Sequence, residues 1–280
     1  MTKQTEKDNN WCINPPLPSL EYHWKKGADP VTKEEINSFF NNPEIISIKK
    51  NICEIGRRLW QKEYVDGNGG NISVRVGDNL ILCTPTLISK GFMDISDICL
   101  VDMEGRQKAG KRPSTSEILT HLSIMQNSDA KSCVHAHPVH ANAFVITNGT
   151  PPTGIMPEPD IFFGEVAMAD YATPGTPENA VNVGKVAKDH QCIFMQSHGV
   201  IVWGAHVEDA YWKLENVDSY CKILLLATQL QTPIMQVSDT EMLDFIGIRQ
   251  KLGMPDNRDQ RHLSKLFNAK SFAGYQFIKR

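Results

Sequence analysis

The chain has 280 residues, of which 41% are hydrophobic and 22% charged, and its formal net charge is −3 at pH 7. This length suffices for one large core or two small domains, and the near-neutral charge does not indicate binding to nucleic acid or to an anionic membrane surface. No apolar run approaches the roughly 20 residues that a helix needs to cross a bilayer.

The N-terminal segment, residues 1–40, is polar and rich in proline, lysine and asparagine. We expect an arm here that is extended or partly disordered. The arm lacks the apolar core of a signal peptide, and the seven cysteines of the chain are scattered without a CxxC pair. Both features favour a cytoplasmic protein with reduced thiols.

The first strong helix prediction falls on "NNPEIISIKKNICEIGRRLW". Asn42 is a candidate cap, Pro43 suits the first turn, and apolar residues recur at helical spacing: Ile45, Ile48, Ile52, Ile55 and Leu59. After the turn-forming "DGNGGN", three runs predict strands, at residues 72–76, 80–84 and 98–103. "RPSTSEILTHLSIM" predicts a further helix, with Ser114 or Thr115 as its cap.

The second half of the chain predicts strands that end at histidines. "SCVHAH" is a short strand, and "CIFMQSHGVIVWG" is a strand pair or one strand bent around residues 197–199. Helices are expected after Thr176, over residues 207–228, and after the capping box formed by Ser238 and Glu241. Because strands and helices do not alternate strictly, we expect a mixed or antiparallel sheet covered by helices.

Three histidines are candidate metal ligands. His135 and His137 lie two residues apart at the end of a predicted strand, so their imidazoles point to the same face. Alone, this pair is more typical of a polar loop end than of a metal site. His198 also ends a strand-like run, and three protein ligands with one open position are typical of catalytic zinc. His140 is a candidate second-shell partner, whereas four others are interpreted as surface or packing residues: His121, His190, His206 and His262.

Six motifs in order carry a resemblance to a known family: "GNGGNISVR", "LCTPT…SKG", "RPSTSE", "VHAHPVHA", "YATPGT" and "QSHGVIVWG". From about residue 46 to 235 the chain resembles the class II aldolase/adducin family, which includes L-fuculose-phosphate aldolases. The resemblance implies an α/β fold, three-layer α/β/α with a central, largely antiparallel sheet. It places the catalytic domain at residues 41–255 and leaves residues 256–280 as a C-terminal tail.

The resemblance also implies the site. A Zn²⁺ ion, or another divalent metal, would be held by His135, His137 and His198, and Glu117 of "STSE" would be the acid/base. By its position alone, Glu117 is typical of a first-turn glutamate favoured by the helix dipole. The substrate phosphate would be bound by four residues that match the family's phosphate cradle: Asn71, Thr86, Thr115 and Ser116.

Two departures from the family pattern concern the substrate. Leu87 replaces a glycine that lets the backbone approach the phosphate, which puts a phosphate contact in doubt. Met156 occupies the expected position of the tyrosine proton donor, with Glu158, Asp160 or Tyr275 as candidate replacements.

The resemblance therefore implies a zinc-dependent lyase of carbohydrate metabolism that cleaves a carbon–carbon bond of a small hydroxy-ketone, a sugar phosphate, through an enediolate. Dehydratase and decarboxylase chemistry remain alternatives, while an epimerase is disfavoured because the resembled epimerase has aspartate in place of Glu117. A non-catalytic adducin-like binding module is the alternative of another class. The relatives imply a homotetramer with the active site between subunits.

Overall fold

The computed structural model describes residues 22–254, 256, 258 and 276–279. Its helices, in chain order, are α1 (Lys33–Phe40), α2 (Pro43–Gln61), the short 3₁₀ helix η1 (Lys90–Phe92), α3 (Ile118–Asn127), α4 (Val139–Ile146), α5 (Pro157–Phe162), α6 (Pro177–Ala187), α7 (Val207–Gln229) and α8 (Asp239–Lys251). Its strands are β1 (Asn71–Arg75), β2 (Ile81–Cys83), β3 (Cys99–Val101), β4 (Gln107–Ala109), β5 (Ser132–Ala136), β6 (Val166–Ala169), β7 (Cys192–Met195), β8 (Gly199–Gly204), β9 (Ile234–Gln236) and β10 (Phe277–Lys279).

Eight strands form one central sheet in the order β4-β3-β2-β1-β5-β8-β7-β6. Neighbouring strands run antiparallel, except that β6 and β7 run parallel. The expected α/β fold with a largely antiparallel sheet is confirmed. β5 and β8 are central neighbours, with Ala136 opposite Val200, so the end of β5 lies beside the beginning of β8.

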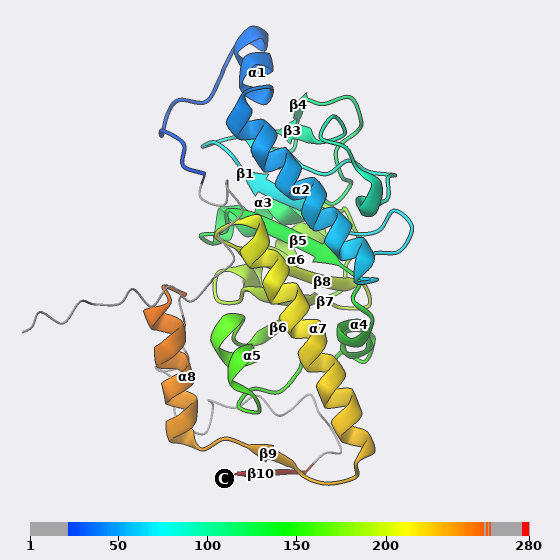
Figure 1. Cartoon of the computed structure of the whole chain (residues 1–280), viewed down its shortest axis with the longest axis vertical. Coiled ribbons are helices and arrows are strands. Elements are labelled where there is room, and N and C mark those ends of the chain that lie inside the picture. Colours follow the sequence, from blue (N-terminus) through cyan, green and yellow to red (C-terminus); the bar gives the residue numbers. More distant parts are fainter. Residues whose placement is uncertain (1–21, 255, 257, 259–275, 280) are drawn as a thin grey trace, which may run out of the picture.

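Helices cover both faces of this sheet (Figure 1). α2, α4 and α7 pack on one face, and α3 and α6 pack together on the other. Alternation along the strands explains the two layers, because successive side chains point to opposite faces. In β1, Ile72 and Val74 join the core under α2 and α7; in β2, Ile81 and Cys83 join the core under α3 and α6.

Several predicted helix starts are confirmed, and one is wrong. Asn42 caps α2, and the Ser238–Glu241 capping box opens α8. Neither Ser114 nor Thr115 caps α3, which begins only at Ile118. The reason is that the preceding segment is extended: Ser114 forms a β-bridge with Pro85, and the Thr115 N–H donates to the Thr84 carbonyl.

The segments outside the central sheet add two observations. Residues 33–40, the last part of the expected arm, form α1, which begins with a capping box of Thr32 and Glu35. In the tail segment, β10 pairs in parallel with β9. Residues 1–21 and 259–275 lie outside the described residues, and the domain boundaries stay predictions. Within the described part of the chain, no helix is both long and apolar enough to span a membrane.

Candidate metal centre

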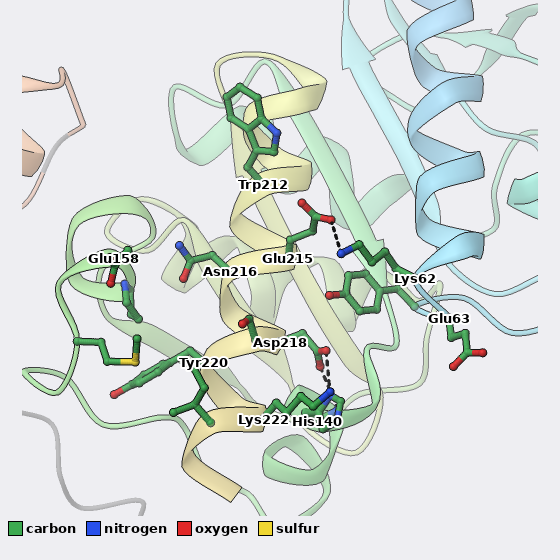
Figure 2. Close-up of a pocket in the computed structure, with 15 residues that line it drawn as sticks. Lys62, Glu63, His140, Glu158, Trp212, Glu215, Asn216, Asp218, Tyr220 and Lys222 are labelled. Atoms are coloured by element: carbon green, nitrogen blue, oxygen red, sulfur yellow. Dashed lines mark hydrogen bonds and ion pairs between the residues drawn. The ribbon is translucent and has the colours of Figure 1, made fainter. Parts of the chain in front are cut away.

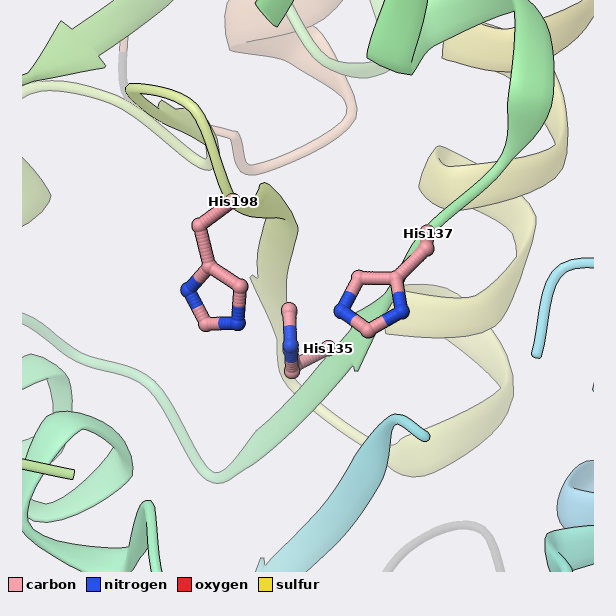
Figure 3. Close-up of side chains that lie close together, drawn as sticks. All are labelled: His135, His137 and His198. Carbon is pink, nitrogen blue, oxygen red and sulfur yellow. The ribbon is translucent and has the colours of Figure 1, made fainter. Parts of the chain in front are cut away.

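Three imidazoles converge where β5 ends and β8 begins (Figure 3). His135 lies on β5, His137 follows it directly, and His198 comes from the turn that joins β7 to β8. The turn is tight because Ser197 adopts a left-handed conformation with φ 55° and the His198 N–H donates to Met195. The ring centroids lie 4.7, 4.8 and 5.5 Å apart, and one potential ligand atom from each residue lies within 4.8 Å of the others. The structure thus brings together the three histidines singled out from the sequence.

The hydrogen bonds of these histidines leave nitrogen atoms available for an ion. His135 Nδ1 donates to the Val200 carbonyl at 2.9 Å, and His137 Nδ1 lies 3.5 Å from Asp66 Oδ1. The opposite nitrogens, His135 Nε2 and His137 Nε2, are buried and have no hydrogen-bond partner among the described residues, and the same holds for His198 Nδ1. Buried polar atoms are rarely left without a partner. A carbonyl or carboxylate on Nδ1 is also the usual support of a metal-bound imidazole, so these residues fit a divalent ion.

The protonation state also suits metal binding. Burial lowers the pKa of His135 to about 3, because the positive form is poorly solvated there. Burial lowers the pKa of His198 as well. Both rings are therefore neutral near pH 7, which is the form that binds a metal.

Glu117 lies directly beside the cluster. Its Oε2 is 3.4 Å from His135 Nε2, and its Oε1 is 3.4 Å from His198 Nε2. Burial raises the pKa of Glu117, but attraction to His135 and His198 in their protonated form and the hydrogen bond donated by Asn71 outweigh this effect, so the pKa is lowered. Glu117 occupies the N-cap position of α3 but makes no capping hydrogen bond with its side chain. Its carboxylate is therefore directed at the histidines and not at the helix end.

The backbone at Gly199 passes very close to the same side chains. A Cβ atom at this position would lie 2.6 Å from His137 Cδ2, 2.9 Å from His135 Cε1 and 2.8 Å from the Ala136 carbonyl oxygen. These distances are shorter than van der Waals contact. Glycine after His198 is thus needed for two of the three imidazoles to reach their positions.

The predicted phosphate-binding residues lie on two adjoining segments. The Thr86 N–H donates to the Pro113 carbonyl, which places the loop after β2 beside the segment with Thr115 and Ser116. Asn71 is buried at the start of β1 and contacts Glu117 instead of solvent. Leu87 has a left-handed backbone conformation, φ 54°, which favours glycine, and its side chain is 77% exposed.

A separate cavity of about 710 Å³ lies along α7, next to α5 (Figure 2). His140 lines it, with Nδ1 at 3.0 Å from Asp218 Oδ2, so His140 is bound to α7 and not to the histidine cluster. Met156 and Glu158 line the same cavity. Asp160 is held by the Gly154 N–H and by Arg258, and Tyr275 lies outside the described residues.

His121, for which the sequence predicts a surface or packing role, is fully buried and forms hydrogen bonds with Ser73 and Asn71 near the site. Its spacing of four residues from Glu117 is the sequence signal, because residues four apart share one face of a helix. Of the other three, His190 forms a hydrogen bond with the Val186 carbonyl and His206 caps α7, whereas His262 lies outside the described residues.

Comparison with known proteins shows what this chain is similar to. The family model for the class II aldolase and adducin N-terminal domain matches residues 50–225. An L-fuculose phosphate aldolase of Methanococcus maripaludis strain S2 is 35% identical over 179 residues, covering 64% of this chain and 96% of that protein. A 3-oxo-tetronate 4-phosphate decarboxylase of Haemophilus influenzae is 30% identical over 202 residues, covering 70% of this chain and 95% of that protein.

Solved structures show the same fold. An L-fuculose 1-phosphate aldolase superposes with a TM-score of 0.66 at 27% identity, covering 74% of this chain and 96% of that one. YgbL from Escherichia coli also reaches a TM-score of 0.66, at 24% identity, and so supports the fold alone.

Proposed function

Since the chain belongs to the class II aldolase and adducin family, we propose that it is a zinc-dependent lyase that cleaves a carbon–carbon bond of a small sugar phosphate. The observation that carries this proposal is the placement of Glu117 at 3.4 Å from both His135 and His198, beside a cluster of three imidazoles with available nitrogens. A non-catalytic module has no need for a buried carboxylate next to three converging imidazoles.

The chemistry follows from these groups. A bound divalent ion supplies Lewis acidity, which stabilises negative charge on substrate oxygens when the carbon–carbon bond breaks. The Glu117 carboxylate, ionised and only 9% exposed, moves the proton at the carbon that keeps the electron pair. The Asn71–Glu117 hydrogen bond keeps the carboxylate in place while it does so.

Decarboxylation of an oxo-acid phosphate is a second candidate that one observation favours. Met156 stands where the resembled aldolases carry a tyrosine proton donor for the departing aldehyde. When carbon dioxide leaves instead, no hydroxyl proton has to be handled on the departing carbon. The Haemophilus influenzae decarboxylase is also similar over 70% of this chain.

The test combines metal analysis with two substrates. We expect about one zinc ion per chain, lost when the three histidines are changed to alanine together. L-fuculose 1-phosphate and 3-oxo-tetronate 4-phosphate are then assayed for aldehyde and for carbon dioxide. Glu117→Gln should keep the metal and the melting temperature but lower turnover by about 100-fold or more.

Glu104→Gln is the matched control, because Glu104 is exposed and its carboxylate pairs with the exposed Arg106. It should leave turnover unchanged. Turnover that survives in Glu117→Gln removes Glu117 from the chemistry. Absence of bound metal after zinc is supplied overturns the lyase proposal as a whole and leaves the binding-module alternative.

The remaining parts of the proposal have their own tests. Asn71, Thr86, Thr115 and Ser116 are proposed to bind the substrate phosphate, which Ser116→Ala tests through a raised KM. A homotetramer in the cytoplasm completes the proposal, and light scattering of the eluting protein measures its mass.

A further inference from the structure

A chain of buried side-chain hydrogen bonds links β1 to α3 behind the histidine cluster. Asn71 and Ser73 lie two residues apart on β1, so they point to the same face of the sheet, toward α3. Glu117 and His121 lie four residues apart at the start of α3 and share one face of the helix. The strand and helix residues therefore interleave, in the order Ser73, His121, Asn71, Glu117.

The direction of each hydrogen bond follows from the carboxylate. Asn71 Nδ2 donates to Glu117 Oε2 at 2.8 Å, so Asn71 Oδ1 faces His121 as an acceptor, 2.5 Å from Nε2. His121 Nε2 then carries the proton, and Nδ1 accepts from Ser73 Oγ at 2.7 Å. With the Asn71 amide turned over, its carbonyl oxygen would face the Glu117 carboxylate, and two acceptors cannot form a hydrogen bond with each other. A single arrangement therefore satisfies all the groups.

Burial makes this arrangement costly to disturb. His121 and Ser73 are 0% exposed and Asn71 is 3% exposed. Burial lowers the pKa of His121 to about 4, so its ring is neutral and both nitrogens are used. Leaving one such buried group without its partner costs about 1–3 kcal/mol. Because an amide neither takes up nor releases protons near pH 7, the chain orients groups and does not conduct protons to Glu117.

We propose that His121 is a positioning residue, which holds the amide of Asn71 and, through it, the carboxylate of Glu117 beside the three histidines. This inference rests on the proposed function only for the catalytic role of Glu117. Among the described residues, the contact from Asn71 is the hydrogen bond that the Glu117 side chain makes, and its Oε1 has no hydrogen-bond partner. If the Asn71 amide is free to turn over, the Glu117 carboxylate loses this hydrogen bond and keeps only its 3.4 Å contacts with His135 and His198.

Two substitutions and one control test the inference by kinetics. His121→Leu removes both hydrogen bonds, whereas His121→Gln keeps an amide that can donate to Asn71. Thr120→Val is the control: Thr120 is the neighbouring residue of α3, is 1% exposed, and accepts one hydrogen bond from Asn179 at 2.9 Å. We expect His121→Leu to lower kcat by about tenfold or more with little change in KM and in zinc content. His121→Gln should recover most of this loss, and Thr120→Val should keep the full kcat.

A measurement on the unchanged, purified protein is independent of turnover. Nitrogen-15 labelling of histidine gives NMR signals that distinguish the two neutral tautomers from the charged ring. We expect one imidazole in the Nε2–H tautomer that does not titrate between about pH 5.5 and 8. Its signals should be lost in His121→Gln, which assigns them.

Each outcome decides the inference. An Nδ1–H or charged ring at His121 overturns it, as does a His121→Leu variant with full kcat, or a loss of kcat that His121→Gln does not recover. If the unchanged protein turns over neither substrate, the proposed function has failed, and the tautomer still decides whether His121 holds the amide as inferred. If His121→Leu does not fold, the comparison of His121→Gln with Thr120→Val replaces it.

Discussion

Replacing Gly199 by alanine should weaken metal binding although the residue is not a ligand. The added Cβ would lie 2.6 Å from His137 Cδ2 and 2.9 Å from His135 Cε1, where carbon atoms prefer about 3.5–4.0 Å. The rings must therefore retreat by roughly 0.5–1 Å, whereas a metal site tolerates ligand distances within about 0.2 Å. The backbone has little room to share this movement, because the Ala136 carbonyl at 2.8 Å belongs to the strand that pairs with β8.

We expect Gly199→Ala to weaken zinc binding by about 10- to 100-fold, the size of effect seen when groups that orient metal ligands are altered. Overpacking should also destabilise the metal-free protein by about 1–3 kcal/mol. Competition with a chromophoric chelator measures the affinity, and thermal unfolding of the metal-free protein measures the stability.

Gly247→Ala on α8 is the matched control, because a Cβ there would have no atom of the described residues within 4 Å. It should leave zinc affinity unchanged and raise stability by up to about 1 kcal/mol. A Gly199→Ala protein that binds zinc as tightly as the unchanged protein would refute the reasoning that the strand must pass this close for the imidazoles to converge.

Three further predictions concern stability, each measured by denaturant unfolding. Burial lowers the pKa of His121 from 6.5 to about 4, so between these pH values the unfolded chain binds a proton that the folded chain does not. The free energy of unfolding of the metal-free protein should therefore fall by up to about 3 kcal/mol as the pH drops from about 6.5 to 4. The fall should be less steep in His121→Gln. Lys90→Met should destabilise the protein by about 2 kcal/mol, since Lys90 Nζ donates to the backbone carbonyls of Asn68 at 2.9 Å and Ile88 at 2.8 Å. An unchanged stability would show that water takes over these two hydrogen bonds. Phe194→Ala, at a fully buried position of β7, should cost about 3–5 kcal/mol, and a smaller loss would show that the core collapses into the space.

The elements that could be predicted are those with a strong local signal. α2 and α7 carry apolar stripes at helical spacing, and α2 begins at a capping asparagine followed by proline. The short elements α4, α5 and β4 lack such signals. β4 has three residues with exposed or half-exposed side chains, so no alternation marks it as a strand. α5 has only six residues, too few for a helical period to be recognised.

The residues of the candidate site likewise fall into those that could be predicted from the sequence and those that could not. His135, His137 and His198 could be predicted to lie together because each ends a strand-like run. The first two alone are more typical of a polar loop end, and the third histidine is what favours a metal site. The hydrogen bonds of His121 could not be predicted, because they depend on how the strand with Asn71 is positioned against α3. That position results from tertiary packing between segments about 50 residues apart, and no local pattern encodes it.

The order of strands in the sheet gives the histidine cluster a second significance. β1 to β5 form one side of the sheet and β6 to β8 the other, and the two sides join at the pairing of β5 with β8. His135 and His137 belong to the first side and His198 to the second. An ion bound by all three histidines would thus cross-link the two halves of the sheet where β5 pairs with β8. A molecule in which the two halves have not yet paired would have neither this cross-link nor the complete site. Tight metal binding would therefore indicate that the sheet has formed completely.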